Sequence, residues 1–389
     1  MVVGEFAWTR TPRIIFGAGT LARLSEIVGV FGRNVVLLTG AHSLKQSDKL
    51  DQVLSMLAQA GSQCRTYTVC REPSPELVND IVTDLRGRES AVVVAIGGGS
   101  VIDAGKAVSA MLPQEHPVEA FLENVGTLAH DGRKVPFVAV PTTAGTGSEA
   151  TVNAVLGRVG HDGYKASLRH PNLAPDVALV DLELTLSCPP AVTAASGLDA
   201  LTQLLEAFVS TRSSPMTDDL ARGGLIAAHE HLLQACRAGQ SDLPARTGMA
   251  YASLMSGLVL ANVGLGVVHG LAGVIGGLCD APHGVICGTL LAAATRRNIE
   301  KLRQIGGPAL HKYAAVGRLF GADTDDVDDC CGTLIETLAG WVAQLELPRL
   351  GDYGLDASRL SEIADRASNK NSPVTLDRTD MTALLHERM

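Results

Sequence analysis

Four polar side chains in the second half of the sequence have the types and spacing of a metal site. Asp199 and Gln203 are four residues apart, so on a helix both point to the same face. His269 and His283 follow, each in an otherwise apolar stretch. A single buried histidine is usually a satisfied core residue, whereas two imidazoles with a carboxylate in one apolar region suit a borderline divalent ion. These residues therefore predict a metal site formed by Asp199, Gln203, His269 and His283.

A glycine-rich turn in the first half has the features of a phosphate-binding site. Gly97-Gly98-Gly99-Ser100 directly follows the apolar run Ala91–Ile96 and opens a helical stretch that contains Asp103 and Lys106. Glycines let the backbone approach an anion closely, and the free N–H groups and dipole of the helix attract it. The pattern is not GxGxxG, so an ordinary tight turn between a strand and a helix is the alternative.

A second polar loop follows another predicted strand, Phe137–Val140. It has the sequence Pro-Thr-Thr-Ala-Gly-Thr-Gly-Ser-Glu over residues 141–149. Its hydroxyl groups and glycine amides could converge on the same ligand as the glycine turn. An isolated loop of this composition would more often be a simple connection, but two such loops at adjacent strand ends favour a shared site.

The elements that must position these residues differ between the two halves. Strand and helix patterns alternate in the first half, which predicts parallel strands joined by right-handed crossovers in a doubly wound sheet, with phosphate ligands at the carboxyl ends of the strands. The predicted strands are Asn34–Leu38, Arg65–Val69, Ala91–Ile96, Phe137–Val140 and Val177–Val180. The predicted helices are Gln46–Ala60, Pro75–Arg86 and Val101–Met111.

After about residue 185 the sequence becomes rich in Ala and Leu, with helix-start signals at Ser196 and at Ser214-Pro215. Cys188-Pro189-Pro190 reads as a hinge, because consecutive prolines disfavour helix at and before them. We therefore expect an α/β domain over residues 1–185 and an all-α domain over residues 186–389.

Composition excludes several classes of protein. With 389 residues and 46% hydrophobic content the chain can bury a large core, so disorder is excluded. The formal charge of −9 and the lack of a basic block argue against nucleic acid as a partner. The eight cysteines form no CxxC pair, and the N-terminus lacks the order of a secretory signal. We expect reduced thiols and a cytoplasmic location.

One stretch imitates a membrane span. Leu254–Leu278 has no charged residue and is long enough to cross a bilayer, but it contains seven glycines together with Asn262 and His269. It also lacks flanking basic residues and an aromatic belt. We interpret it as helices buried inside a large α-helical domain, and no membrane association is expected.

Taken together, the motifs resemble those of the iron-containing (group III) alcohol dehydrogenases, in the superfamily that also holds glycerol dehydrogenase and dehydroquinate synthase. The resemblance spans nearly the whole chain. Its pieces are Pro12–Gly19, GGGSVIDAGKA, PTTAGTGSEAT, Gly197–Glu206, NVGLGVVHGLAG and Ala281–Gly284. It implies a nucleotide-binding α/β domain followed by a helical domain, with cofactor and metal in the cleft between them. It also implies a homodimer or a larger homo-oligomer.

The resemblance assigns cofactor contacts residue by residue. The pyrophosphate is expected on Gly97, Gly98, Gly99 and Ser100, with Asp103 in the helix that follows. The nicotinamide side is expected to be lined by Thr142, Thr143, Thr146 and Ser148, and the ribose or a phosphate to lie near Asn153 and Lys165. The first strand ends in Thr39-Gly40-Ala41-His42-Ser43, without a carboxylate, so either NAD or NADP is compatible, with Gly40, His42 or Ser43 near the adenosine.

The family binds its metal with one Asp and three His, and this chain departs from that pattern. Asp199, His269 and His283 match three ligands, but the histidine expected four residues after the Asp is Gln203. Another histidine, expected four residues after His269, is Gly273. Glutamine is a weaker donor than imidazole, so metal affinity should fall. Three alternatives remain: bound Fe²⁺ or Zn²⁺ with Gln203 as a ligand or near-ligand, a loosely held metal that is lost on purification, or a site without metal.

The function implied is reversible hydride transfer between NAD(P)(H) and a small alcohol, aldehyde or ketone. A divalent metal would stabilise the developing alkoxide, or His269 or His283 would donate a proton in its absence. One alternative is a metal-free oxo-acid reductase resembling maleylacetate reductases, with Arg158 or Arg169 facing the substrate. The other is a catalytically silent nucleotide-binding protein.

Overall fold

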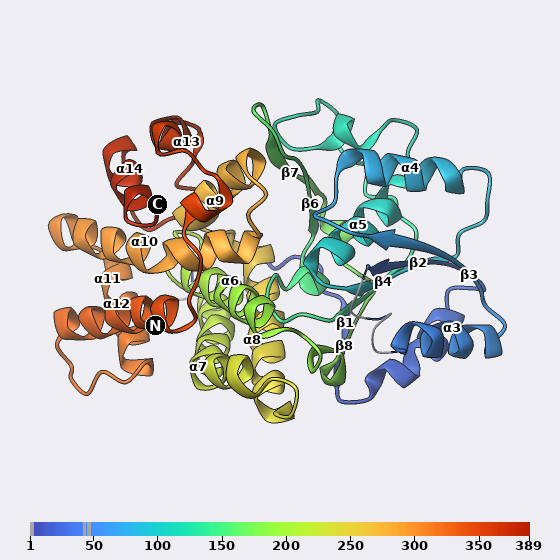
Figure 1. The fold of residues 1–389 in the computed structure, drawn as a ribbon, viewed down its shortest axis with the longest axis horizontal. Coiled ribbons are helices and arrows are strands. Elements are labelled where there is room, and N and C mark those ends of the chain that lie inside the picture. Colours follow the sequence, from blue (N-terminus) through green and yellow to red (C-terminus); the bar gives the residue numbers. More distant parts are fainter. Residues whose placement is uncertain (1–3, 42–43, 45–47) are drawn as a thin grey trace.

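Short runs of β-branched residues in the first half of the chain form one six-stranded parallel sheet. The computed structural model describes residues 4–41, 44 and 48–389, and Figure 1 shows the sheet and its helices beside a second, helical half. The strand order is β1-β8-β5-β4-β2-β3, and every neighbouring pair is parallel. The strands are β1 (Arg13–Gly17), β2 (Asn34–Gly40), β3 (Gln63–Val69), β4 (Val92–Gly97), β5 (Phe137–Pro141) and β8 (Val177–Asp181).

Alternate residues of the central strands feed two separate cores, as the two-residue period of a strand requires. Leu37 and Val94 pack with α1 (Leu24–Gly29) and α3 (Lys49–Gln59) on one face of the sheet. The intervening Val36 and Val93 pack on the other face with α4 (Pro75–Leu85) and α5 (Gly99–Met111). Because helices cover both faces, the predicted doubly wound sheet is confirmed.

The predicted strands and helices of the first half are all present, with ends shifted by a few residues. The helix expected from Gln46 begins at Lys49, and residues 45–47 lie outside the described part of the chain. Three strands were not predicted. β1 is short and partly exposed, and the antiparallel hairpin of β6 (Asn153–Arg158) and β7 (Tyr164–Arg169) is rich in polar residues, so none forms a long apolar run.

The chain changes direction within the sheet between β2 and β4. From β2 it runs outward to β3, whereas from β4 it continues through β5 to β8 on the other side. Ligands of doubly wound sheets bind at such a switch point, beyond the carboxyl ends of the strands. Gly40 and Gly97 end the two strands there, and Gly97 is in register with Pro141 of β5. The glycine turn and the polar loop therefore begin side by side.

The second half is helical, as predicted (Figure 1). Ser214 caps the second of its helices with its side chain and forms a capping box with Thr217, as expected from the sequence. The helices are α6 (Pro190–Phe208), α7 (Pro215–Ala238), α8 (Leu243–Val263), α9 (Val267–Leu278), α10 (His283–Ile305), α11 (Pro308–Leu319), α12 (Val327–Gln344), α13 (Leu360–Arg366) and α14 (Arg378–His386).

The predicted helix start at Ser196 is wrong. The first helix of this half, α6, begins six residues earlier at Pro190, with Pro189 as its N-cap, because the fixed φ of proline suits the first turn of a helix. Ser196 lies inside α6 and donates a hydrogen bond to the carbonyl oxygen of Val192 at 2.7 Å. Strands end at Asp181, and a domain boundary at residues 185/186 stays a prediction.

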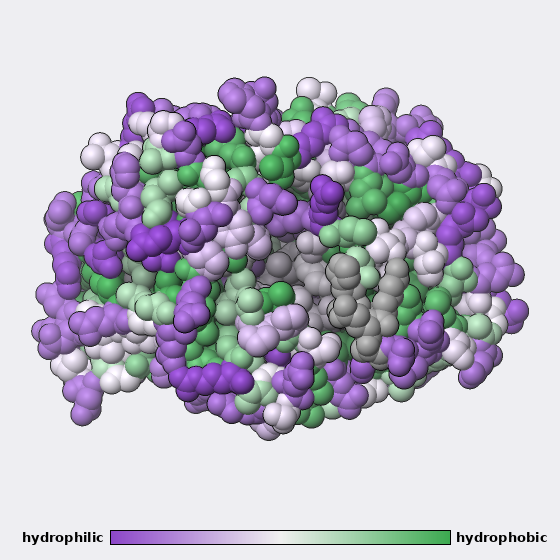
Figure 2. All heavy atoms as spheres, viewed as in Figure 1, coloured by the Kyte–Doolittle hydropathy of each residue, from purple (hydrophilic) through white to green (hydrophobic). Residues whose placement is uncertain are grey.

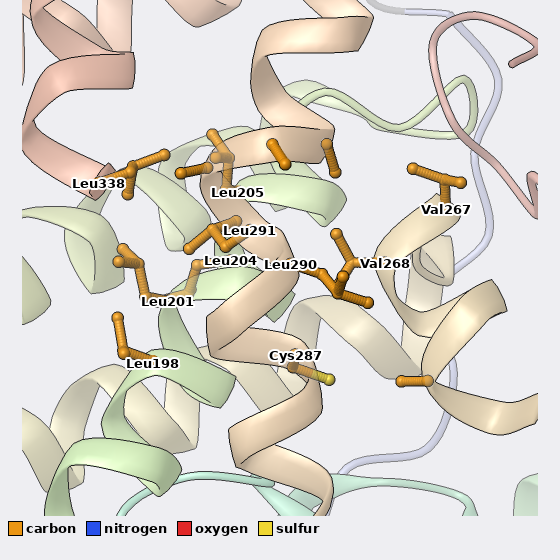
Figure 3. Close-up of a cluster of buried hydrophobic side chains, with 14 of the residues drawn as sticks. Leu198, Leu201, Leu204, Leu205, Val267, Val268, Cys287, Leu290, Leu291 and Leu338 are labelled. Atoms are coloured by element: carbon orange, nitrogen blue, oxygen red, sulfur yellow. The ribbon is translucent and has the colours of Figure 1, made fainter. Parts of the chain in front are cut away.

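The long apolar stretch of the sequence forms two buried helices, as expected. The stretch forms the end of α8 and the whole of α9, two helices that meet at 97°. Both contribute to the large core of the helical half, and Figure 3 shows Val267 and Val268 of α9 in it. Within the described residues, no single helix is long and apolar enough to cross a membrane. The bent pair of α8 and α9 reaches that length and apolar character only when the two helices are taken together. On the face shown in Figure 2, hydrophilic side chains predominate and hydrophobic ones form small patches.

Short 3₁₀ helices connect these elements. They are η1 (Thr20–Arg23), η2 (Val118–Phe121), η3 (Ser148–Ala150), η4 (Pro171–Leu173), η5 (Leu182–Thr185), η6 (Leu350–Tyr353) and η7 (Ala357–Arg359).

Candidate active site

The glycine turn after β4 presents the open N-terminus of α5. Gly98 is the N-cap, and within the described chain no side chain caps this end of the helix. A Cβ added at Gly99 would lie 2.6 Å from Cγ2 of Thr146, so only glycine fits there without moving the polar loop. A helix N-terminus with free N–H groups attracts phosphate through hydrogen bonds and the helix dipole. The turn therefore has the geometry of an anion cradle.

Two charged side chains of α5, Asp103 and Lys106, hold the end of the polar loop over residues 141–149. Asp103 accepts hydrogen bonds from the hydroxyl of Ser148 and from the backbone N–H of Val155. Lys106 donates to the carbonyl oxygens of Ser148 at 2.8 Å and Asn153 at 2.7 Å, and to the hydroxyl of Thr151 at 2.7 Å. Burial lowers the pKa of Lys106 to about 8. These contacts hold the loop against the helix that opens at the glycine turn.

Glu149, the last residue of the loop, is 2% exposed. Burial raises its pKa to about 7, although the charge of Lys106 acts in the opposite direction. The loop thus contains a carboxyl group whose ionisation is costly in the folded state.

In the helical half, three predicted side chains converge on one point. Asp199 of α6 lies with its Oδ1 3.4 Å from Nε2 of His269 on α9 and 3.9 Å from Nε2 of His283 at the start of α10. Asp199 is 1% exposed, and its Oδ1 has no hydrogen-bond partner among the described residues. A buried carboxylate oxygen without a partner, faced by two imidazole nitrogens, is suited to a cation.

His269 is held in place by a second carboxylate. Its Nδ1 lies 2.7 Å from Oε2 of Glu206, which also accepts a hydrogen bond from the N–H of Gly266 at 2.9 Å. The other oxygen of Glu206 accepts from the N–H of Val268 at 2.7 Å. Because the carboxylate can only accept, Nδ1 of His269 carries a proton, and Nε2 is the ring nitrogen that faces Asp199 and His283.

The ionisation of these side chains is coupled. Burial opposes ionisation of Asp199, but its interactions with His283 and His269 outweigh this effect and hold its pKa below the usual value. Burial lowers the pKa of His283 to about 4. Burial acts to lower the pKa of His269, but its neighbours Cys287, Asp199 and Glu206 raise it well above the usual value. At neutral pH, Asp199 and His283 are therefore in the forms that coordinate a divalent ion, whereas His269 must release a proton when an ion binds.

Gln203 lies beside this group, and both ends of its amide are already hydrogen-bonded. Its amide nitrogen donates to Oδ2 of Asp199 at 3.3 Å, and its carbonyl oxygen accepts from the hydroxyl of Ser256 at 2.8 Å. The amide nitrogen must face Asp199, since a carboxylate has no hydrogen to donate. Gln203 thus contacts the group through its nitrogen.

One cavity of about 200 Å³ joins the two halves of the site. From the helical half it is lined by Gln203, His269, Gly273 and His283. From the predicted cofactor residues it is lined by Gly99, Ser100, Asp103, Thr146, Ser148, Asn153 and Lys165.

Other predicted residues lie behind or beside this cavity. Asp199 is buried beneath its wall, and Thr142 donates its backbone N–H to the carbonyl oxygen of Gly97 at 2.9 Å. Gly40 lies near α5, since a Cβ there would be 3.7 Å from Val101. Thr143 is the side chain nearest to a Cβ placed at Gly98. The predicted contacts of His42 and Ser43 lie outside the described residues.

Two residues of the site were missed in the sequence. Cys287 is fully buried, and its sulfur lies 3.6 Å from Nε2 of both His269 and His283, yet its sequence context suggested only a reduced thiol. Its place four residues after His283 on one helix face is the signal that could have found it. Glu206 follows Asp199 by seven residues, which again places both on one face of α6.

Comparison with known proteins agrees with this architecture. The family model of iron-containing alcohol dehydrogenases matches residues 11–182, and that of their C-terminal domain matches residues 193–389. The chain is 31% identical over 368 residues to the NADPH-dependent butanol dehydrogenase of Clostridium saccharobutylicum, covering 92% of this chain and 90% of that one. It is 33% identical over 354 residues to the 1,3-propanediol dehydrogenase of Citrobacter freundii, covering 87% and 88%.

Among solved structures, that of a 1,3-propanediol oxidoreductase superposes with a TM-score of 0.88 at 28% identity, covering 99% of this chain and 100% of that one. The matched regions include both the glycine turn and the converging histidines. The chain therefore belongs to the iron-containing alcohol dehydrogenase family and is an NAD(P)-dependent oxidoreductase.

Proposed function

We propose that the cavity between the two halves is where this enzyme transfers hydride between NAD(P)(H) and a small alcohol, aldehyde or ketone. The observation that carries the proposal is that one cavity is lined both by the open helix N-terminus at Gly99 and by His269 and His283. A phosphate cradle and a polar group able to polarise a substrate oxygen thus face the same space.

We assign the cofactor to the first half of the cavity. NAD(P)H supplies the hydride, and the backbone of Gly97, Gly98, Gly99 and Ser100 is proposed to hold its pyrophosphate. The polar loop, with Thr142, Thr143, Thr146 and Ser148, is proposed to face the nicotinamide. Asp103 acts there by fixing Ser148. Asn153 and Lys165 are proposed near the ribose, and the salt bridge of Lys165 with Glu72 holds its ammonium at the cavity wall.

The metal is proposed to be held by Asp199, His269 and His283. When bound, a divalent ion supplies a Lewis acid that stabilises negative charge developing on the substrate oxygen. The residues themselves orient the site, because Glu206 fixes the ring of His269 and Gln203 fixes the carboxylate of Asp199. A Cβ added at Gly273 would meet nothing within 4 Å of the described chain. This open space beside His269 leaves room for substrate or for water that carries the proton.

The substrates proposed are short primary alcohols and their aldehydes. The relatives named for butanol and 1,3-propanediol support this choice. The test is oxidation of NADPH and NADH by purified enzyme with butanal and 3-hydroxypropanal, before and after chelation and with Fe²⁺ or Zn²⁺ restored. Loss on chelation and recovery on restoration are expected. Full turnover by the metal-free protein would refute the metal's role.

An oxo-acid reductase is the second candidate, because cationic side chains reach the cavity. Arg169 and Lys370 both line it, and Arg169 also forms a salt bridge of 2.8 Å with Glu123. Arg158, the other residue considered from the sequence, instead pairs with Glu76 and Glu119 on the surface. A carboxylate-bearing substrate would be attracted to Arg169 and Lys370. This reading predicts a higher kcat/KM for a short 2-oxo acid than for butanal, and a loss of that preference in Arg169→Gln.

A further inference from the structure

A buried thiol lies among the converging side chains of the helical half. Cys287 is on α10 one turn after His283, and Figure 3 shows its sulfur directed away from the labelled leucines of α6. Resting on the metal-assisted function proposed above, we propose that Cys287 is the fourth metal ligand of this enzyme. The ion is then held by Asp199, His269, His283 and the thiolate of Cys287, and Gln203 is a positioning residue.

The spacing of the donor atoms supports this set. The sulfur of Cys287 is 3.6 Å from Nε2 of His269 and 3.6 Å from Nε2 of His283, and Oδ1 of Asp199 is 3.4 and 3.9 Å from the same nitrogens. All four donor atoms lie within 4.8 Å of one another. Tetrahedral coordination with metal–N and metal–O bonds of about 2.1 Å and metal–S bonds of about 2.3 Å places donors about 3.4 to 3.6 Å apart. Three of the four quoted separations match this range, and the 3.9 Å between Asp199 and His283 would have to shorten by about 0.5 Å around a zinc-sized ion.

The two oxygens of the Asp199 carboxylate have different surroundings. Oδ2 accepts the hydrogen bond from the amide of Gln203, whereas Oδ1 has no hydrogen-bond partner in the described part of the chain and faces the histidines. The carbonyl oxygen of Gln203, the only atom through which it could coordinate, accepts from Ser256. Gln203 thus orients the ligand Asp199, and the sulfur of Cys287 is the fourth donor of the proposed coordination tetrahedron.

This donor set changes the metal that the site should prefer. A thiolate is a softer donor than an imidazole and favours zinc among the divalent ions available to such sites. Carboxylate and thiolate together neutralise a divalent ion, whereas a site with one carboxylate and three imidazoles keeps a positive charge. We therefore expect Zn²⁺ to be preferred over Fe²⁺. Zinc can accept a fifth ligand, so four protein donors still leave the substrate oxygen a place.

The test is spectroscopic and does not depend on turnover. Chelated wild-type protein is titrated with Co²⁺, and a sulfur-to-cobalt charge-transfer band in the near ultraviolet is expected at one ion per chain. The band should be absent in Cys287→Ser. It should persist in the control Cys279→Ser, a buried cysteine after α9 whose thiol donates to the carbonyl oxygen of Ile275. Cys287→Ser should also raise the Kd for Zn²⁺ by at least about 10-fold, the smallest loss seen when support for a metal ligand is removed.

A second measurement uses only the wild-type protein, so its result does not depend on whether Cys287→Ser folds correctly. X-ray absorption of the zinc-loaded protein should show one sulfur at about 2.3 Å beside nitrogen and oxygen neighbours. A zinc or cobalt centre with only nitrogen and oxygen neighbours, a band that persists in Cys287→Ser, or no metal binding would each overturn the inference. NAD(P)H-dependent reduction of butanal, assayed in parallel, reports separately on the proposed reaction, because a protein can reduce the aldehyde with a metal that has no sulfur ligand.

Discussion

Replacing Glu149 by glutamine should stabilise the protein in mildly alkaline solution and have little effect in acid. Glu149 is buried in the loop beside the cofactor turn, and burial raises its pKa to about 7 from the usual 4.5. Glutamine has nearly the shape of the neutral acid and cannot ionise. The variant therefore removes the cost of a buried carboxylate and keeps the packing.

The sign and size follow from proton linkage. Between pH 4.5 and 7 the folded chain holds this proton more tightly than the unfolded chain, so the contribution of Glu149 to the free energy of unfolding falls as pH rises. The loss is complete above the folded pKa and amounts to about 3 kcal/mol at pH 8, against under about 1 kcal/mol at pH 5. Glu149→Gln should thus be about 3 kcal/mol more stable than wild type at pH 8.

Urea unfolding of both proteins at pH 5, 6, 7 and 8 measures this difference. Glu336→Gln, on the exposed side of α12, controls for the loss of one surface carboxylate. The stability gap between wild type and Glu149→Gln should widen with pH, mainly between pH 5 and 7.5. A gap that is constant across this range, or that narrows with pH, would show that Glu149 is ionised at no cost and refute the reasoning.

Three further changes test the cofactor turn, the support of the metal site and the core. Gly99→Ala should weaken NADPH binding by about 10- to 100-fold in a fluorescence titration, because the new methyl group displaces Thr146. The control Gly332→Ala should bind NADPH normally, since its new methyl group has no neighbour within 4 Å in the described chain. Glu206→Gln should raise the Kd for Zn²⁺ about 10- to 100-fold in competition with a chelator, because His269 loses its carboxylate partner; unchanged affinity would contradict this role. Leu204→Ala, at a fully buried position, should lower the free energy of unfolding by about 2 to 5 kcal/mol in urea, and a loss below 1 kcal/mol would mean that the core closes around the cavity.

The parts of the fold that depend on local sequence could be predicted. The strand before Gly97 is a continuous apolar run buried on both faces, and the glycines that follow it predicted the tight turn into a helix. The hairpin of β6 and β7 could not be predicted in this way. Its partly buried positions carry mixed polar residues, and its place is set by contact with α9, where the carbonyl oxygen of Gly277 accepts from the N–H of Gly160.

The candidate site was predictable in its residue types but not in its geometry. The sequence indicated that Asp199 and two histidines would meet, since all three lie in apolar helical segments. The direction of the Gln203 side chain depends on Ser256, which is 53 residues away in the chain. The approach of Cys287 to His269 likewise depends on how α9 packs on α10. No local pattern encodes such packing, although the four-residue spacing on α10 was a usable clue.

Two glycines of the polar loop have a role that the sequence did not reveal. They were expected to offer amides to a ligand, but a Cβ at Gly145 would lie 2.6 Å from that of Ser196 on α6, and one at Gly147 would lie 2.4 Å from the backbone of Gly257 on α8. Both glycines therefore let the loop touch the helical half directly.

This contact links the position of the loop to that of the side chains at the proposed metal site. The hydroxyl of Ser256 lies 3.4 Å from the carbonyl oxygen of Gly145 and 2.8 Å from that of Gln203, whose amide holds Asp199. We expect a ligand that shifts the loop to disturb the carboxylate through Ser256, and an ion that fixes the carboxylate to restrain the loop. Such linkage is reciprocal: the factor by which the ion changes the affinity for the dinucleotide equals the factor by which the dinucleotide changes the affinity for the ion. Order of addition would then affect the rate of assembly but leave the final occupancy the same.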